Sequence, residues 1–237
     1  MENRNGFYEV SKENRININI IDSESENITK ITEPDGFIIS EDQEKLLNKY
    51  LRLVERCDVV VLSGNIPNGG DSSLLEYMIQ IAKEKNKITI LNINGMLRKN
   101  LDSKPTVITV DFNSLSYFNG DNNSSTKSAI AAAKKICTTN IDTVIIHNWN
   151  GSFFIVCKEG VYEGTFYLNK PLNNINPNEV ISAGFAVGMS RGYSLVDTIK
   201  LTAAVSKSVY SNKNGYFNQK DVEKLFKYEK VKFHENI

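Results

Sequence analysis

The chain has 237 residues, of which 41% are hydrophobic and 24% charged, as in an ordinary globular protein. Its 28 basic and 28 acidic residues cancel at pH 7, and no basic block indicates nucleic-acid binding. No apolar run is long enough to cross a membrane and no signal-peptide core opens the chain, so we expect a cytoplasmic protein without membrane contact.

The residues that commonly carry chemistry are few and scattered. Cys57, Cys137 and Cys157 lie far apart without a CxxC pair, so we expect reduced, half-buried thiols rather than a zinc site or disulfides. The chain has only two histidines, His147 and His234, so we do not expect a histidine-based catalytic triad. His147 follows a predicted strand, and we interpret it as a polar residue at a sheet edge rather than as a ligand.

The first elements form a ribbon. Residues 15–21 alternate isoleucine with polar residues, and residues 27–33 alternate again after a turn-rich segment. Period-two alternation is typical of strands with one buried face, so we predict a β-hairpin. A turn signal at 33–36 ends it.

Helices and strands then alternate. Ser40 caps a predicted amphipathic helix, and Asp71 caps another over 71–85. Apolar runs predict buried strands at 58–64, 87–95, 106–113 and 142–151, with a helix at 125–137, a hairpin over 152–167 that turns at Glu159-Gly160, and helices at 177–191, 195–210 and 218–226. Such alternation predicts an α/β fold with a mainly parallel sheet covered on both faces.

In such folds ligands bind beyond the carboxyl ends of the strands. The segments to inspect are 63–70, 92–95, 111–114 and 147–151, together with the helix start at 176–179. Neither a GxxxxGK[ST] loop nor a GxGxxG turn after a strand occurs, so the usual phosphate and dinucleotide fingerprints are missing.

The helix start reads Asn-Pro-Asn-Glu. Asn176 is a good N-cap, Pro177 suits the first helical position, and Glu179 falls where a capping box places an acid that folds back onto the cap N–H. We predict that this first turn caps itself. The small residues that follow favour close packing, or the wall of a nucleotide site.

Several of these segments together resemble the ribokinase-like (PfkB) carbohydrate kinases, particularly the 1-phosphofructokinase and tagatose-6-phosphate kinase branch. The resemblance rests on "CDVVVLSGNIPNGG" (57–70), "NRININI" (14–20), "AGFAVGMSRGYSLVDTIKLTAAV" (183–205) and "NGYFNQKDVEKLFKYEKVKF" (214–233). It implies a three-layer αβα sandwich with a small β-ribbon lid. Residues 1–36 would be the remnant of the lid, and residues 37–237 the ribokinase-like α/β domain.

The resemblance also implies transfer of the ATP γ-phosphoryl group to a sugar-phosphate hydroxyl with Mg²⁺. Glu179 aligns with the family base, and Asn176, Pro177 and Asn178 align with its anion hole. Substrate and lid positions are Arg15, Asn17, Ser63 and Gly64; nucleotide-side positions are Asp111, Ser114, Asn148, Gly151 and Gly215, with Mg²⁺ expected near Asp111.

The departures from the family fall at those same positions. Both glycines of the GAGD-type motif are replaced, and Pro177 removes one N–H donor. Ser114 replaces a carboxylate of the Mg²⁺ motif, and large side chains near Ser206, Lys207 and Tyr210 are expected to fill the base pocket. The match begins at the lid, so we expect an incomplete sheet with exposed apolar surface and an unpaired edge.

Three hypotheses follow from these departures. In the first, the chain is a sugar-phosphate kinase, impaired or inactive as it stands. In the second, it is a catalytically dead relative that acts as a binding module, pairs as a homo- or hetero-dimer through the lid ribbon, or is a truncated gene remnant. In the third, the start of the sequence is misplaced and a longer gene product exists. No nucleic acid or membrane partner is expected.

Overall fold

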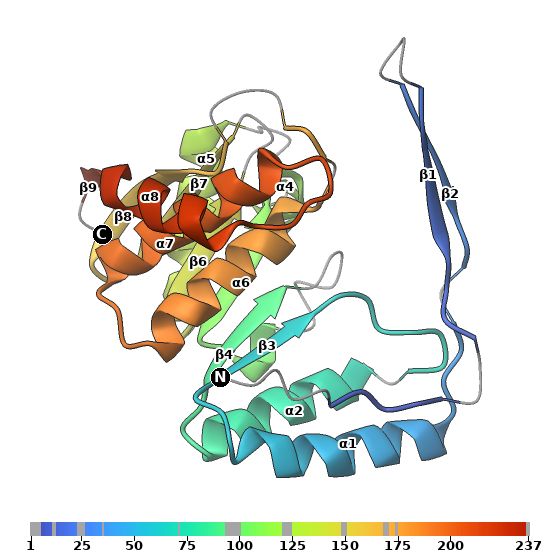
Figure 1. Cartoon of the computed structure of the whole chain (residues 1–237). Helices are drawn as coiled ribbons and strands as arrows, with labels where there is room; N and C mark the ends of the chain where they lie inside the picture. The colour runs from blue at the N-terminus through green and yellow to red at the C-terminus, as the bar shows by residue number, and fades with distance from the viewer. Residues whose placement is uncertain are drawn as a thin grey trace.

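The computed structural model describes residues 6–10, 13–22, 27–34, 36–70, 72–92, 101–119, 125–147, 151–167, 171–173 and 175–235. It contains a two-stranded ribbon and an α/β body (Figure 1). The ribbon pairs β1 (Asn17–Ile21) with β2 (Ile28–Thr32) in antiparallel register, with Ile18 opposite Ile31. The predicted hairpin is confirmed, and Figure 1 shows it standing away from the body.

The body is built on a mixed sheet of seven strands. These are β3 (Val59–Ser63), β4 (Ile88–Asn92), β5 (Val107–Asp111), β6 (Thr143–His147), β7 (Ser152–Cys157), β8 (Gly160–Thr165) and β9 (Lys232–Glu235), in that spatial order. Strands β3 to β6 are parallel, as the alternation of strands and helices predicts. From β6 to β9 the neighbours are antiparallel, because the hairpin after His147 returns directly instead of crossing over through a helix.

Helices cover both faces of the sheet. They are α1 (Ser40–Val54), α2 (Ser72–Glu84), α4 (Phe112–Asn119), α5 (Thr126–Cys137), α6 (Pro177–Ser190), α7 (Leu195–Tyr210) and α8 (Gln219–Tyr228), with a 3-10 turn at Leu101–Ser103. One core packs α2, α4 and α5 against the sheet, and a smaller one adds α1. The other face is covered by α6 and α7, and α8 packs on α7. This is the predicted αβα sandwich.

Two glycines set the close approach of α6 to α7. A Cβ on Gly184 would lie 2.9 Å from the backbone Cα of Thr202, and one on Gly188 would lie 2.7 Å from the Thr198 side chain. A larger residue at either position would overlap the neighbouring helix, because such contacts are shorter than van der Waals separation. Close packing against α7 therefore explains part of the small-residue pattern of α6.

Several predicted boundaries were wrong. Ser40 is not a cap: the helix begins at it, and the N-cap position is Ile39, which makes no side-chain cap hydrogen bond. The strand predicted at 106–113 ends at Asp111, because Phe112 already begins α4. Neither α4 nor β9 was predicted. The strand predicted as buried at 58–64 is β3, whose alternate residues are exposed because it lies at the sheet edge. The predicted cap Asp71 lies outside the described residues.

No helix among the described residues is long and apolar enough to span a bilayer. The three cysteines are free thiols; Cys57 and Cys137 are half-buried, as expected, whereas Cys157 is buried.

Candidate functional site

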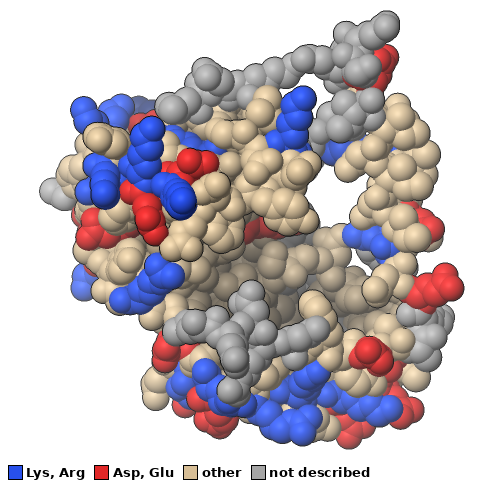
Figure 2. Space-filling view, in the orientation of Figure 1, with Lys and Arg blue, Asp and Glu red and all other residues tan. Residues whose placement is uncertain are grey.

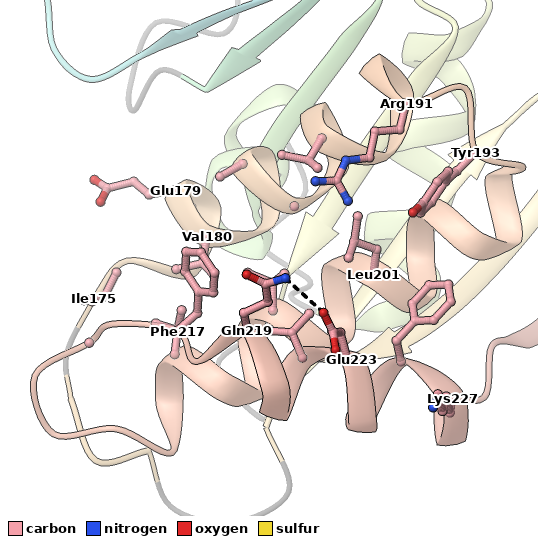
Figure 3. A pocket seen from close by; sticks show the side chains of 18 residues that line it. Ile175, Glu179, Val180, Arg191, Tyr193, Leu201, Phe217, Gln219, Glu223 and Lys227 are labelled. Carbon is pink, nitrogen blue, oxygen red and sulfur yellow. Dashed lines mark hydrogen bonds between the residues drawn. The ribbon is translucent and has the colours of Figure 1, made fainter. Parts of the chain in front are cut away.

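A groove of about 850 Å³ runs between α6, α7 and α8 (Figure 3). This volume lies in the range of small-molecule sites. Its apolar lining comes from all three helices: Val180, Ala183 and Val187 of α6, Leu201, Val205 and Val209 of α7, and Val222 and Phe226 of α8. The groove therefore suits the flat apolar faces of a ligand, with its polar groups held at the ends and rim.

Polar residues lie at the two ends and along the rim of the groove. Figure 3 shows Glu179 at one end, and Arg191, Tyr193 and Lys227 at the other. Gln219 donates from Nε2 to Glu223 Oε1 (2.9 Å) along the rim. The charges at the two ends are opposite, so an extended ligand would meet different electrostatic surroundings at each end.

The first turn of α6 is capped from within the chain. Asn176 is the N-cap: its Oδ1 accepts from Asn178 N (3.1 Å), and its carbonyl oxygen accepts from Glu179 N (3.1 Å). Pro177 occupies the first helical position, as predicted, and has no N–H. The other half of the predicted capping box was wrong, because the Glu179 carboxylate is exposed, lines the groove and makes no hydrogen bond with any described residue.

Asn178 is the residue of this turn that faces inward. It is only 2% exposed, and its Oδ1 has no hydrogen-bond donor within the described part of the chain. One helical turn further on, Ser182 donates from Oγ to Thr109 Oγ1 of β5 (2.9 Å) in a buried contact. Asn178 therefore lies over the carboxyl end of β5, on the sheet-facing side of α6.

Two of the predicted site positions meet where β3 and β4 end. Asn92 donates from Nδ2 to Ser63 Oγ (3.0 Å), and Gly64 N donates to Asn92 O (3.1 Å). Gly64 has a φ of 111°, which a residue with a side chain rarely adopts. Ser63 and Gly64 thus form a fixed turn at the strand exit, and it is held by the amide of Asn92, the first residue of the segment 92–95 that the sequence pointed to.

Asp111 caps α4 instead of standing free. Its Oδ1 accepts from Ser114 N (2.9 Å) and its Oδ2 accepts from Ser114 Oγ (2.9 Å). Among the described residues no group of three His, Cys, Asp or Glu side chains could hold a metal ion. Mg²⁺ is commonly held by only one or two carboxylates together with water and phosphate oxygens, so its expected place near Asp111 stays a prediction.

His147 lies beside Asp111 at the end of β6, in register with it. The interpretation as an edge residue was wrong: β6 is a central strand, and His147 is 1% exposed. Burial lowers the pKa of His147 from the ordinary 6.5 to about 4, while the negative charge of Asp111 opposes the shift. The imidazole is therefore neutral at pH 7.

Of the remaining nucleotide-side positions, only Gly215 reaches the groove. It lines the groove with a φ of 70°. Gly151 has a φ of 94° and packs under the ring of Tyr167, outside the groove lining. Asn148 lies outside the described residues.

The residues expected to fill the base pocket do not line the groove. Ser206 donates from Oγ to Thr202 O (2.7 Å), Lys207 forms a buried ion pair with Glu229, and Tyr210 donates from its hydroxyl to Ile175 O (2.9 Å). Their side chains are thus used elsewhere on α7. The row of α7 that faces the groove is Leu201, Val205 and Val209.

The lid positions lie far from this groove in the structure. Asn17 is in β1 opposite Thr32, and Arg15 lies two residues before Asn17; both are exposed. Figure 1 shows the ribbon on the opposite side of the body from α7 and α8. The structure therefore does not bring the lid positions together with the groove.

Comparisons with known proteins agree on a family relationship. No family model matches the chain. The chain is 26% identical over 196 residues to a 1-phosphofructokinase of Bacillus subtilis, covering 82% of the chain and 63% of that protein. It is 23% identical over 229 residues to a tagatose-6-phosphate kinase of Staphylococcus epidermidis, covering 94% and 73%. The chain thus spans less than two thirds of the length of the first of these relatives.

The fold has solved counterparts. The phosphofructokinase-2 of Escherichia coli, solved with substrates and products, superposes with a TM-score of 0.78 at 15% identity, covering 90% of this chain and 70% of that one. A likeness at this identity concerns the fold alone: the mixed sheet with its two helical layers also occurs in that solved structure.

Proposed function

As a member of the ribokinase-like (PfkB) family of carbohydrate kinases, this chain, we propose, binds a nucleotide in the groove between α6, α7 and α8. We further propose that it carries an impaired machinery for transfer of the ATP γ-phosphoryl group to a sugar-phosphate hydroxyl. The substrates are inferred from the names of its relatives.

The shape and lining of the groove support nucleotide binding. Gly215 and Phe217 lie in its wall near Ile175, and the apolar rows of α6 and α7 offer a surface on which a flat base can rest. Glu179 lies at the same end of the groove (Figure 3). A base bound there would direct its phosphates toward the first turn of α6, the end of a helix that attracts anions.

The self-capped turn of α6 is the observation that supports impairment. In the proposed reaction, Glu179 removes the proton of the sugar hydroxyl as its oxygen attacks the γ-phosphorus, and ADP leaves. Stabilisation of the developing negative charge then depends on free N–H groups. Asn176 already occupies the N–H of Asn178, and Pro177 offers none, so fewer donors remain for the phosphoryl group.

Calorimetric titration with ATP tests the binding step. We expect micromolar affinity for the wild type and none for Ala183→Trp, because Ala183 is exposed in the groove wall and an indole there fills it. Ser190→Trp is the matched control, since Ser190 is an exposed residue of α6 that does not line the groove. Equal ATP affinity of the two variants would contradict the proposed site. So would a wild type that does not bind ATP at millimolar concentration.

A coupled ADP-release assay tests the transfer step. With fructose 1-phosphate, fructose 6-phosphate or tagatose 6-phosphate, we expect turnover far below the roughly 1–100 s⁻¹ typical of kinases. Glu179→Gln should abolish the remainder while ATP still binds. Turnover within the typical range would refute the impairment, and none above a boiled control would favour the catalytically dead binding module.

Partner binding through the ribbon is a second candidate function, with residues 1–36 acting as a lid-derived module. The observation that favours it is an exposed apolar face. Ile16, Ile18 and Ile20 alternate along one arm, Ile31 lies opposite Ile18, and all four are about half exposed. An isolated two-stranded ribbon is marginally stable in water, so a partner that covers this face would stabilise it.

Light scattering after size exclusion tests the ribbon as a contact. Ile18→Asn makes the centre of the face polar, so it should dissociate any complex that the ribbon holds together. Asn19→Ser, one residue along on the opposite face, is the matched control. A complex unaffected by Ile18→Asn would exclude the ribbon as its interface.

A further inference from the structure

Main-chain polar groups at one end of the groove are already used within the chain. This base end, where the proposed nucleotide base lies, is lined by Ile175, Val209, Gly215 and Phe217. Ile175 O accepts from the Tyr210 hydroxyl (2.9 Å), and Gly215 N donates to Asn212 O (2.9 Å). A base that lies against these residues therefore meets groups that have found their partners elsewhere.

Asn173 takes up further polar groups at the base end. Its Nδ2 donates to Val209 O (2.7 Å) and to Asn212 O (2.8 Å). Its Oδ1 accepts from Ile175 N (3.2 Å). The Asn212 amide is used in the same way, because its Nδ2 donates to Tyr216 O (3.0 Å). Both asparagine side chains hold the chain to itself, and what the lining offers a ligand is mainly apolar surface.

Phe217 and Gln219 are the side chains best placed to meet a base. Phe217 lines the groove and is 60% exposed. Any base can stack on such a ring, because every base has a π-face. Gln219 lies along the rim and donates from Nε2 to Glu223 Oε1 (2.9 Å), so its amide oxygen is the group left to meet the edge of a base. Adenine, guanine and hypoxanthine each carry an N–H that this oxygen could accept.

Surface charge near the groove does not separate the bases either. Basic and acidic residues alternate along α8, and Figure 2 shows the two signs intermixed on this face of the molecule. The field of such a surface acts on the triphosphate, which all nucleoside triphosphates share. Selection among bases therefore depends on the lining of the base end.

We propose that this site takes purine nucleoside triphosphates as a class, with little preference among adenine, guanine and hypoxanthine. The inference rests on the proposed nucleotide site and widens it beyond ATP. A site that reads its ligand through dedicated hydrogen-bonding groups rejects an analogue by about 10⁴–10⁵-fold, whereas an apolar pocket discriminates by about 200-fold at most. Phe217 holds the base by stacking, whichever purine it is.

Calorimetric titration of the full chain with ATP, GTP, ITP and CTP tests this inference. The dissociation constants of the three purine nucleotides should lie within about tenfold of one another. CTP should bind more weakly than all three, because its single ring covers less apolar surface. A larger preference for one purine, or CTP bound as tightly as ATP, overturns the inference and leaves the nucleotide site standing. If none of the four binds at millimolar concentration, the proposed site itself is wrong, and the inference with it.

Phe217→Ala tests the stacking ring. It should raise the dissociation constants of all three purine nucleotides by similar factors of at least about five. Tyr216→Ala is the matched control, since Tyr216 is 75% exposed and does not line the groove. Far-UV circular dichroism checks that both variants fold, as the exposure of both rings leads us to expect. An ATP affinity that Phe217→Ala leaves unchanged, or that Tyr216→Ala lowers equally, overturns the role of the ring.

Discussion

At the scale of single residues, the buried ion pair between α7 and the end of α8 stands out. Lys207 Nζ lies 2.7 Å from both carboxylate oxygens of Glu229, and the two side chains are 9% and 5% exposed. Removing one partner of such a pair leaves an uncompensated charge in a poorly solvated place. The pair therefore fixes where the chain leaves α8.

We expect Lys207→Met to lower the free energy of unfolding by about 3–5 kcal/mol in urea titrations. Lys207→Met combined with Glu229→Gln should recover much of the loss, because no buried charge is then left alone. Lys45→Met is the matched control: Lys45 pairs with Glu41 on the exposed face of α1 and should cost at most about 1 kcal/mol. Equal losses of unfolding free energy in Lys207→Met and Lys45→Met would show that the Lys207–Glu229 pair is solvated.

His147 gives stability a defined pH dependence. Its pKa is about 4 in the folded chain and about 6.5 when exposed, so between these values only the unfolded state binds the proton. Stability contributed by the neutral imidazole is therefore complete above pH 6.5 and is lost as pH falls toward 4. By pH 5 the loss is about 2 kcal/mol.

Urea titrations at pH 7 and pH 5 measure this loss, and His147→Gln removes the titrating group. We expect the wild type to lose about 2 kcal/mol more than the variant over that interval. His234→Gln, which alters the exposed histidine of β9, is the control and should behave like the wild type. Parallel pH profiles for the wild type and His147→Gln would contradict the buried, neutral imidazole.

At the scale of elements, the α6–α7 contact depends on missing side chains. Gly188→Ala places a methyl group 2.7 Å from Thr198, so it should lower the free energy of unfolding by about 1–3 kcal/mol despite the better helix propensity of alanine. Adding Thr198→Ala should restore part of the loss. Ser190→Ala, on the exposed side of the same helix, should stay within about 0.5 kcal/mol of the wild type. If Gly188→Ala left the free energy of unfolding unchanged, α6 and α7 would have to move apart at little cost.

The sequence predicts elements whose pattern is local. The ribbon was found because Ile16, Ile18 and Ile20 alternate, and the central strands because their apolar runs end at polar residues. Helix α4 was missed because Phe112 continues the apolar run of β5 without a turn residue. Strand β9 was missed because its mixed polar sequence becomes a strand only through pairing with β8.

The candidate site was predictable only at its capped end. Asn176 and Pro177 carry a local capping signal, and both positions are confirmed. The groove arises from rows four residues apart on α6 and α7, such as Ala183–Val187–Arg191 and Leu201–Val205–Val209. Each row is visible in the sequence, but nothing local shows that they line one cavity with α8. That depends on tertiary packing.

At the scale of the whole molecule, we expect the ribbon to open more readily than the central sheet. The ribbon has two strands and exposed isoleucines, whereas every residue of β6 is buried between strands and helices. In hydrogen-exchange mass spectrometry, peptides covering 17–21 and 28–32 should exchange at least about tenfold faster than those covering 143–147. Comparable protection would show that the ribbon is covered in solution, and repeating the measurement on Ile18→Asn would show whether association covers it.

Asp111 couples ligand chemistry to helix stability. It ends β5 and caps α4 without an intervening loop, and both of its oxygens are engaged by Ser114. A cation that took the lone pairs now used by Ser114 would displace the cap, at a cost of about 1 kcal/mol. Its affinity would then be reduced about fivefold. A cation bound to Asp111 in place of Ser114 would therefore loosen the first turn of α4. The stability of that turn would then show whether Ser114 or the cation holds the Asp111 carboxylate.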